Sequence, residues 1–422
     1  MTVPDYDVAI VGAGIAGSTL ASLLAPHARV ILIDRDVRGL PGSTGHAPGV
    51  VAQINTLPVL TELARRSVAA YTAIPNGFDN VGCLEVVRGA DGKNWIQDRV
   101  AVARERKLEH SVLTTKEAQS LAPAFVHDDA TGAIYYPNDG TANAKTVTWH
   151  AQDLAAASGA TLVDGNVTSI TRLGQTYTIT TSDDAHTARR VVVATGVWAG
   201  QLCPCLASRA VAFAHPYAFA NRHAPRTRMA PFARFPDAVM YVRDHGDRIG
   251  IGSYNHDPVV VRTAATKVLP TAYTPFQPQF THTMDDAIRL LPPSTAATFA
   301  GRVDAQPAEL TMLAAGNVPY GFTGVFTITP DGLPLVGRIN LGMYAAIGCW
   351  VTHAAGSMRV LADLIVADIR GEDAPEADEW LRAALDPCRF HPMADVECES
   401  HAVDKYKDIW NKKDQAKVLA AL

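Results

Sequence analysis

Between Val8 and Gly17 the chain reads Val8-Ala9-Ile10-Val11-Gly12-Ala13-Gly14-Ile15-Ala16-Gly17. The four apolar residues at the start are typical of a β-strand that is covered on both faces. The glycines that follow have the spacing G-x-G-x-x-G. In such a motif Gly12 permits a tight turn, Gly14 lets the backbone approach a pyrophosphate, and Gly17 allows close packing of a helix on the strand.

The segments after this motif complete a strand–helix–strand unit. Residues 18–25 are helix formers that end at Pro26, and a second apolar strand at residues 30–33 is closed by Asp34. The N-terminus of the helix presents free N–H groups to phosphates, and the carboxylate of Asp34 can accept both ribose hydroxyls. A glycine-rich turn without a ligand is the alternative. Because the motif follows a strand, begins a helix and is followed by Asp34 at the end of the next strand, the sequence predicts a dinucleotide-binding site.

The composition excludes several other classes of protein. The chain has 422 residues, of which 48% are hydrophobic and 19% charged, so intrinsic disorder is excluded and two or three structural units are expected. Lys and Arg number 37 against 42 Asp and Glu, without a basic stripe, which argues against a nucleic-acid partner. Apolar runs are shorter than the ~18 residues of a membrane span, and the N-terminus lacks the pattern of a signal peptide. We therefore expect a cytoplasmic enzyme without a membrane partner.

The cysteines do not indicate a disulfide framework or a metal site. They are too sparse for a disulfide-rich fold in a chain of this length. Cys203-Pro204-Cys205 has no CxxC or HxxxH segment to complete a metal site. We expect no bound metal. The six cysteines are Cys83, Cys203, Cys205, Cys349, Cys388 and Cys398.

Two later segments indicate which dinucleotide is bound. The apolar strand Val191–Ala194 is followed by Thr195-Gly196, and residues 348–356 are small residues that open a helix near the C-terminus. Both are recurring features of flavoproteins with two dinucleotide-binding folds, in which the late helix points its N-terminus at the flavin. An ordinary core strand at Val191–Ala194 is the alternative. Together the two segments favour FAD over NAD.

Strands of this apolar type recur near residues 8, 30, 191 and 344, with long insertions between them. This pattern predicts one parallel sheet assembled from distant segments, hence an α/β (α+β) fold in which a Rossmann-like FAD-binding domain is interleaved with a mixed β-sheet substrate domain. The FAD-binding domain would take residues 1–80, 140–205 and 330–390, and the substrate domain residues 81–139 and 206–329. Residues 391–422 would form a tail helix, docked on the surface with its lysines opposite its apolar positions.

Five blocks of sequence lie in order between residues 6 and 390. They are Ser43–Gly49, Ala214-His215-Pro216-Tyr217, Tyr241–Tyr254, Phe326–Gly337 and Trp350-Val351-Thr352-His353. With these blocks the chain resembles the FAD-dependent amine oxidoreductases of the D-amino acid oxidase superfamily. Within it, the chain is similar to the flavin module of dimethylglycine oxidase, dimethylglycine dehydrogenase and sarcosine dehydrogenase. The segment 221–237 departs from the family pattern.

The resemblance implies a set of cofactor residues and a covalent link. His46 matches the histidine that is bonded to the 8α-methyl carbon of the flavin in those enzymes, so we expect covalent FAD there. A loop histidine that only donates a hydrogen bond is the alternative. The residues expected to bind FAD are Gly12, Gly14, Ile15, Ala16, Gly17, Asp34, Arg35, Ser43, Thr44, Gly45, His46, Val50, Val167, Thr195, Gly196, Trp350, Val351, Thr352 and His353.

The resemblance also implies a catalytic pair. His215 and Tyr241 match the two residues that face the substrate amine in dimethylglycine oxidase. An amine gives up hydride only when its nitrogen lone pair is free, so His215 would take the proton and Tyr241 would hold the substrate or tune the histidine. A structural histidine and a strand aromatic are the alternatives. Arg243 and Tyr254 are candidates for binding a substrate carboxylate, with a solvated charge as the alternative for Arg243.

These observations predict FAD-dependent oxidation of a C–N bond in a secondary or tertiary amine, N-methylated or cyclic amino acid-like. Hydride transfer gives an iminium that is hydrolysed or trapped, and O₂ or an electron carrier reoxidises the flavin. One alternative is a 2-hydroxy acid or polyol phosphate oxidoreductase on the same fold, and another is a non-catalytic flavin-binding protein. The larger members of the family continue into a folate-binding module, and since no candidate follows residue 390 we expect no folate domain.

Overall fold

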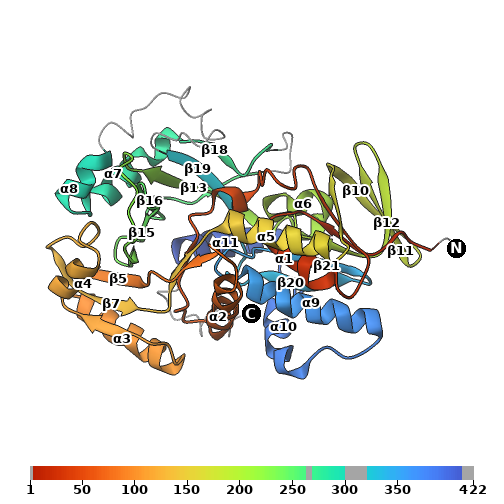
Figure 1. Ribbon diagram of the computed structural model, residues 1–422, viewed down its shortest axis with the longest axis horizontal. Coiled ribbons are helices and arrows are strands. Elements are labelled where there is room, and N and C mark those ends of the chain that lie inside the picture. Colours follow the sequence, from red (N-terminus) through yellow and green to blue (C-terminus); the bar gives the residue numbers. More distant parts are fainter. Residues whose placement is uncertain (1–2, 263–268, 300–320, 411–422) are drawn as a thin grey trace.

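The structure, a computed structural model, describes residues 3–262, 269–299 and 321–410. Two large sheets lie on opposite sides of the molecule. Figure 1 shows strands β10 (Val167–Leu173), β11 (Thr176–Thr181) and β12 (Ala185–Val193) on one side and β5 (Cys83–Arg88) and β7 (Ala130–Tyr136) on the other. Helices α2 (Pro58–Thr72) and α11 (Asp395–Lys407) lie between them. Each sheet is assembled from segments that lie far apart in the sequence.

The first sheet contains the glycine motif. Its central strands β12, β1 and β2 are parallel, with Val11 opposite both Val193 and Ile33, and β21 adds to β12 in the same direction. This confirms the predicted parallel pairing of the strands near residues 8, 30, 191 and 344. The strand order is β10 (Val167–Leu173), β11 (Thr176–Thr181), β12 (Ala185–Val193), β1 (Tyr6–Val11), β2 (Val30–Asp34) and β9 (Thr161–Asp164), with β21 (Met343–Ile347) beside β12 and β20 (Leu335–Asn340) beside β21.

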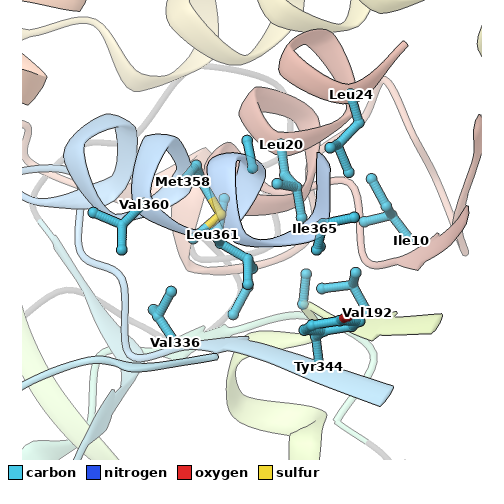
Figure 2. Packing of buried hydrophobic residues seen from close by; sticks show 14 of the residues in the cluster. Ile10, Leu20, Leu24, Val192, Val336, Tyr344, Met358, Val360, Leu361 and Ile365 are labelled. Carbon is cyan, nitrogen blue, oxygen red and sulfur yellow. The ribbon is translucent and has the colours of Figure 1, made fainter. Parts of the chain in front are cut away.

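The core of this part lies between the sheet and two helices, α1 (Ile15–Leu24) and α9 (Ala354–Arg370). Along β1 the side chains alternate between the two faces, and Ile10 points to the helices, where Leu20 and Leu361 meet it in one fully buried cluster (Figure 2). Ala9 and Val11 pack on the opposite face. Both faces are therefore covered, as the uninterrupted apolar run predicts.

Within the described residues the second sheet has ten strands and is mixed. It contains the hairpin of β15 and β16, in which Tyr241 lies opposite Gly252. It also contains the long strand β13, which runs antiparallel to β19 with His215 opposite Gly324. The strand order is β18 (Tyr273–Pro275), β19 (Gly321–Ile328), β13 (Val211–Phe219), β16 (Ile249–Ser253), β15 (Met240–Asp244), β14 (Phe232–Phe235), β5 (Cys83–Arg88), β7 (Ala130–Tyr136) and β6 (Ser111–Leu113), with β17 (Val259–Val260) beside β13.

The remaining elements connect or cover the sheets. Helix α9 is the helix that the small residues at 348–356 predict near the C-terminus. Strands β3 (Val50–Val51), β8 (Gly140–Ala142) and β4 (Phe78–Asp79) form a small third sheet. The other helices are α2 (Pro58–Thr72), α3 (Gly92–Glu105), α4 (Thr115–Leu121), α5 (Ala144–Ala157), α6 (Ala199–Leu202), α7 (Thr281–Arg289), α8 (Pro293–Ala296), α10 (Glu379–Leu385) and α11 (Asp395–Lys407).

The C-terminal segment is expected to form a helix docked on the surface, and α11 occupies the described part of it. Helix α11 packs on β13 and β19, where Tyr406 is fully buried among Phe213, Ile328 and Ala402. On its other side Val396, Glu397 and Ser400 are exposed. Lys405 departs from the expectation, because this lysine is buried instead of facing solvent. The apolar positions Val418, Leu419 and Leu422 of the expected helix lie outside the described residues.

None of the helices in the described part of the chain combines the length and the apolar character needed to cross a membrane.

Candidate active site

A cavity of about 380 Å³ extends from the glycine motif of the first sheet to the inner face of the second. Almost all residues predicted for the site line it. Of the residues predicted to bind FAD or to form the catalytic pair, Gly17 and Gly45 are the two that do not. The predicted residues that line the cavity are Gly12, Gly14, Ile15, Ala16, Asp34, Arg35, Ser43, Thr44, His46, Val50, Val167, Thr195, Gly196, His215, Tyr241, Trp350, Val351, Thr352 and His353.

The glycine turn fits its role by close approach of backbone. Gly12 has φ of +109°, which L side chains rarely adopt, and a Cβ there would collide with the backbone of Ala194. Gly17 lies one turn into α1, where a Cβ would collide with the carbonyl oxygen of Gly12. Gly17 therefore allows the helix to pack on the turn, although it does not line the cavity. The N-terminus of α1 consequently opens onto the cavity at Gly14 and Ile15.

Asp34 lies at the end of β2, where the motif predicts a ribose-binding carboxylate. Its Oδ2 accepts a hydrogen bond from the backbone N–H of Ala13 at 2.7 Å, and Oδ1 accepts one from Asp36 N–H at 3.1 Å. These bonds fix the carboxylate at the cavity wall, beside Arg35. Burial raises the pKa of Asp34, with the two backbone hydrogen bonds opposing this effect. The parallel pairing of β1 and β2 thus places the carboxylate next to the glycine turn.

Several polar atoms in the cavity wall have no partner among the described residues. They are Nε2 of His46, Oγ1 of Thr195 and Oγ1 of Thr327, and all three are buried. Burial, with Lys145 as a smaller cause, lowers the pKa of His46 to about 4, so its imidazole is neutral at neutral pH. Buried polar groups are normally hydrogen-bonded. Unpaired atoms along a cavity that begins at a dinucleotide motif therefore fit a bound FAD.

The C-terminal block forms another wall of the cavity. Trp350 donates from Nε1 to the Thr327 carbonyl at 2.9 Å, and Thr352 donates to the Val50 carbonyl at 3.2 Å. His353 precedes the first residue of α9, and burial lowers its pKa to about 4. The start of α9 therefore lies beside the cavity, as the sequence predicts for the late small-residue helix.

His215 and Tyr241 come together on neighbouring parts of the second sheet. His215 Nε2 lies 3.1 Å from the Tyr241 hydroxyl, and the Tyr254 ring stacks on the imidazole at 4.1 Å between centroids. Burial lowers the pKa of His215 well below its usual value, and burial raises that of Tyr241 well above its own. Both groups are neutral at neutral pH. Tyr254, a candidate carboxylate partner in the sequence, contributes its ring to the same wall.

The other candidate for a substrate carboxylate, Arg243, is excluded by its position. Its guanidinium donates to the backbone carbonyl of Pro48, and the residue does not line the cavity. Side chains alternate along a strand, and Arg243 does share the face of Tyr241. Its guanidinium nevertheless reaches the loop that contains Pro48.

Arg234, on the neighbouring strand β14, lines the cavity where Arg243 does not. It belongs to a buried charge cluster in which Arg99 forms two hydrogen bonds of 2.7 Å to Glu85, and Arg234 lies 3.5 Å from the same carboxylate. Burial opposes ionisation of Glu85, but Arg99 and Arg234 lower its pKa. Burial raises the pKa of nearby Asp139 to about 7. Two guanidiniums thus face the ionised Glu85 carboxylate and Asp139, which is only partly ionised at neutral pH, so that positive charge exceeds negative charge in the cluster.

Sequence reasoning missed Arg234 because it lies in the segment that departs from the family pattern. It also missed residues that reach the cavity from the C-terminal end of the chain. Ile409 and Trp410 line the cavity, with Arg234 over the Trp410 ring at 4.8 Å. The hydroxyl of Tyr406 lies 3.2 Å from His215 Nδ1. A local pattern gives no sign of such contacts, since they depend on where α11 docks.

These features define a dinucleotide-binding oxidoreductase with a neutral histidine–tyrosine pair in its cavity. The chain belongs to the FAD dependent oxidoreductase (DAO) family, which it matches over residues 7–364. FAD is therefore its cofactor, and the flavin-dependent oxidoreductase predicted from the sequence is confirmed at this level.

Individual proteins match the chain at low sequence identity. Mitochondrial sarcosine dehydrogenase of Mus musculus is 24% identical over 408 residues, which cover 91% of this chain and 41% of that protein. The chain thus spans about two fifths of the sarcosine dehydrogenases that it matches. Among solved structures, L-proline dehydrogenase from P. horikoshii aligns with a TM-score of 0.70 at 18% identity, covering 92% of this chain and 99% of that one. Glycine oxidase from Geobacillus kaustophilus aligns with 0.69 at 20% identity over 92% and 99%. These structures share the fold.

The close approach at Gly12 gives a first prediction. In Gly12→Ala the added Cβ meets the Ala194 backbone, so the turn must move away from the cavity. We expect purified Gly12→Ala to contain less than about a tenth of the FAD of the wild type, a loss of roughly 1.4 kcal/mol or more in binding. Flavin absorbance per polypeptide measures this.

The matched control is Gly174→Ala. Gly174 also has a positive φ, of +62°, but a Cβ there meets nothing within 4 Å. It therefore carries a similar backbone strain without a collision, and it lies in the turn between β10 and β11. We expect full FAD content in this variant. Equal flavin content in both variants and the wild type would contradict the role of the turn.

Proposed function

We propose that the protein oxidises a C–N bond in a secondary or tertiary amine that carries a carboxylate, such as an N-methylated or cyclic amino acid. The observation that supports this most directly is the neutral His215–Tyr241 pair in the cavity that begins at the dinucleotide motif. FAD, when bound, accepts a hydride from the carbon next to the nitrogen. The chain's own part is to bind the amine, remove its proton and position it.

The electrostatics of the cavity favour the neutral form of an amine. The net positive cluster around Arg234 raises the cost of a second positive charge nearby and attracts a carboxylate. His215 and Tyr241 add no charge. A zwitterionic amino acid would therefore place its carboxylate toward Arg234 and lose its ammonium proton toward Tyr241 and His215. Only then is the nitrogen lone pair free to assist hydride loss.

The product and the second half-reaction follow from this chemistry. Hydride loss leaves an iminium, which water hydrolyses unless an internal nucleophile traps it. O₂ or an electron carrier then reoxidises the flavin. We place the protein in the cytoplasm, since its six cysteines are free thiols. Sarcosine dehydrogenase and glycine oxidase, by their names, act on small amino acids, which supports this substrate class.

An anaerobic titration tests the proposal. We expect N-methylated or cyclic amino acids to bleach the flavin absorbance of the purified holoprotein, and 2-hydroxy acids and polyol phosphates to leave it unchanged. Bleaching by a 2-hydroxy acid and by none of the amines would support the alternative activity, a 2-hydroxy acid oxidoreductase. Absence of bleaching with every amine of the panel would reject amine oxidation.

We also propose that His46 carries the FAD covalently. Its neutral imidazole has a buried nitrogen without a partner among the described residues, which is what attack on an electrophilic flavin carbon requires. The wild type should give a yellow pellet in acid, and its intact mass should exceed that of the polypeptide by one FAD. His46→Ala should release all its flavin into the supernatant, whereas the variant of an exposed histidine, His391→Ala, should retain it. A colourless wild-type pellet would reject the link.

Arg234 gives a separate prediction about specificity. If its guanidinium binds the substrate carboxylate, Arg234→Met should raise KM for a carboxylate-bearing amine by about 10–100-fold, because a hydrogen bond to a charged group contributes roughly 1.5–3 kcal/mol. KM for a matched amine without a carboxylate should hardly change. The control is Arg289→Met, which removes an exposed guanidinium on α7. An equal loss with both amines would assign Arg234 a structural role instead.

A further inference from the structure

A chain of hydrogen bonds leads from the cavity wall to the edge of the protein. The Tyr241 hydroxyl lies 3.1 Å from His215 Nε2, His215 Nδ1 lies 3.2 Å from the Tyr406 hydroxyl, and that hydroxyl lies 2.9 Å from Nε2 of His256. Tyr241, His215 and Tyr406 are buried. His256 is half-buried, in a loop where the residues on either side of it are exposed. The four side chains come from β13, β15, the segment after β16, and α11.

The carbonyl at the outer end fixes the direction of these bonds. His256 Nδ1 lies 2.7 Å from the Asp257 carbonyl, which only accepts, so Nδ1 carries the proton. In neutral His256, Nε2 then accepts from the Tyr406 hydroxyl. The Ala214 carbonyl is a second acceptor for this hydroxyl, at the longer distance of 3.3 Å.

The tautomer of His215 follows from that of His256. With its proton directed at His256, the Tyr406 oxygen accepts from His215 Nδ1–H. Neutral His215 therefore has its lone pair on Nε2, facing the Tyr241 hydroxyl and the cavity. This is the orientation in which His215 can receive a proton from the substrate side while it donates another on the far side.

We propose that Tyr406 and His256 complete a proton relay that carries the amine proton from the cavity to solvent. The substrate N–H bond breaks as an O–H bond forms on Tyr241, whose own proton moves to His215 Nε2. His215 passes its Nδ1 proton to Tyr406, Tyr406 passes its proton to His256 Nε2, and His256 releases its Nδ1 proton to water. Each bond that breaks is matched by one that forms, and no electrons are transferred. The inference rests on the proposed amine oxidation.

The groups around the relay favour transfer of a proton through His215 over its retention on that imidazole. Burial and the nearby His256 both lower the pKa of His215, and in the described residues no carboxylate compensates a charge on it. The other titratable or charged groups that face the relay are Tyr217 on β13, Arg234 on β14, and Tyr254 and Asp257 around the loop after β16. Of these only Asp257, at the outer end, is negative. A positive charge is therefore better tolerated at His256 than at His215.

Tyr406→Phe tests the middle of the relay. It removes the hydroxyl and keeps the ring that packs against Phe213 and Tyr254. In anaerobic stopped-flow measurements at neutral pH we expect flavin reduction by a substrate amine to slow by about 10²-fold, the lower end of what general acid–base catalysis contributes. The deficit should shrink as pH rises, because hydroxide then removes the proton. The control is Tyr177→Phe, which loses a hydroxyl bonded to the Leu341 carbonyl in the first sheet and should reduce at the wild-type rate.

His256→Ala tests the outer end, where a small base can enter. We expect a similar slowing, and we expect added imidazole to restore the rate in proportion to its free-base concentration. His282→Ala, in which an exposed histidine of α7 is removed, should show neither effect. A slow His256→Ala that imidazole does not restore would mean that His256 only supports the fold. Wild-type rates in both His256→Ala and Tyr406→Phe at every pH would overturn the relay.

A measurement without substrate separates this proposal from the proposed function. Nitrogen-15 spectra of histidine-labelled holoprotein, assigned with the His256 and His215 variants, should show both rings as Nδ1–H tautomers. Tyr406→Phe should change the His256 and His215 signals together. A proton on Nε2 of His256 would overturn the relay even if amines reduce the flavin. If no amine reduces the wild type, the proposed function fails, whatever the tautomers are.

Discussion

The parallel pairing of β1 with β12 is the contact on which the site depends. It places Val11 opposite Val193, and at the end of the pair the Ala194 N–H donates to the Val11 carbonyl at 2.8 Å. The next residue, Gly12, then turns so close to the Ala194 backbone that no side chain fits. The close approach orients the start of α1 toward the cavity. A segment near residue 194 is thus as necessary to the dinucleotide site as the glycine motif itself.

Burial is the second constraint, and it sets the charge state of every reactive group in the cavity. Without a compensating partner, burial disfavours the charged form of an ionisable side chain. His46, His215 and His353 are therefore neutral bases, although an exposed histidine titrates near pH 6.5. Beside the His215–Tyr241 pair the positive charge of the cavity wall lies on Arg234, where the Glu85 carboxylate stabilises it, while Arg35 lies at the dinucleotide end. Such a cavity separates a place for a carboxylate from a place for a neutral nitrogen.

The parts of this arrangement that the sequence predicts are those with local signals. The glycine spacing, the apolar strands and the small residues that open α9 each reflect a requirement of their own segment, and these elements lie where expected. The parallel order of distant strands was also predictable, because strands covered on both faces must share a sheet with helices on its faces. The His46, His215 and Tyr241 positions came from a family resemblance, and their roles remain predictions.

What could not be predicted depends on the docking of segments without a local signal. Arg243 and Arg234 are equivalent in composition and lie on adjacent strands, yet the first bonds the Pro48 carbonyl and the second faces the cavity. Strand alternation alone does not distinguish them, because Arg234 lies opposite Tyr241 and Arg243 lies two residues from it, so both share the face of Tyr241. The same holds for β18, whose Tyr273 ring packs on His46 at 3.8 Å between centroids.

Helix α11 shows how far such docking reaches into the chemistry. Read alone, its sequence resembles an ordinary amphipathic helix, and its one internal tyrosine carries no sign of a catalytic role. Placed across β13 and β19, that tyrosine supplies a partner for His215 Nδ1, on the side of the ring away from the Nε2 that faces Tyr241. In neutral histidine the partner of one nitrogen bears on which nitrogen carries the proton. In the proposed relay the C-terminal segment therefore sets the tautomer of His215, which no motif around His215 itself could do.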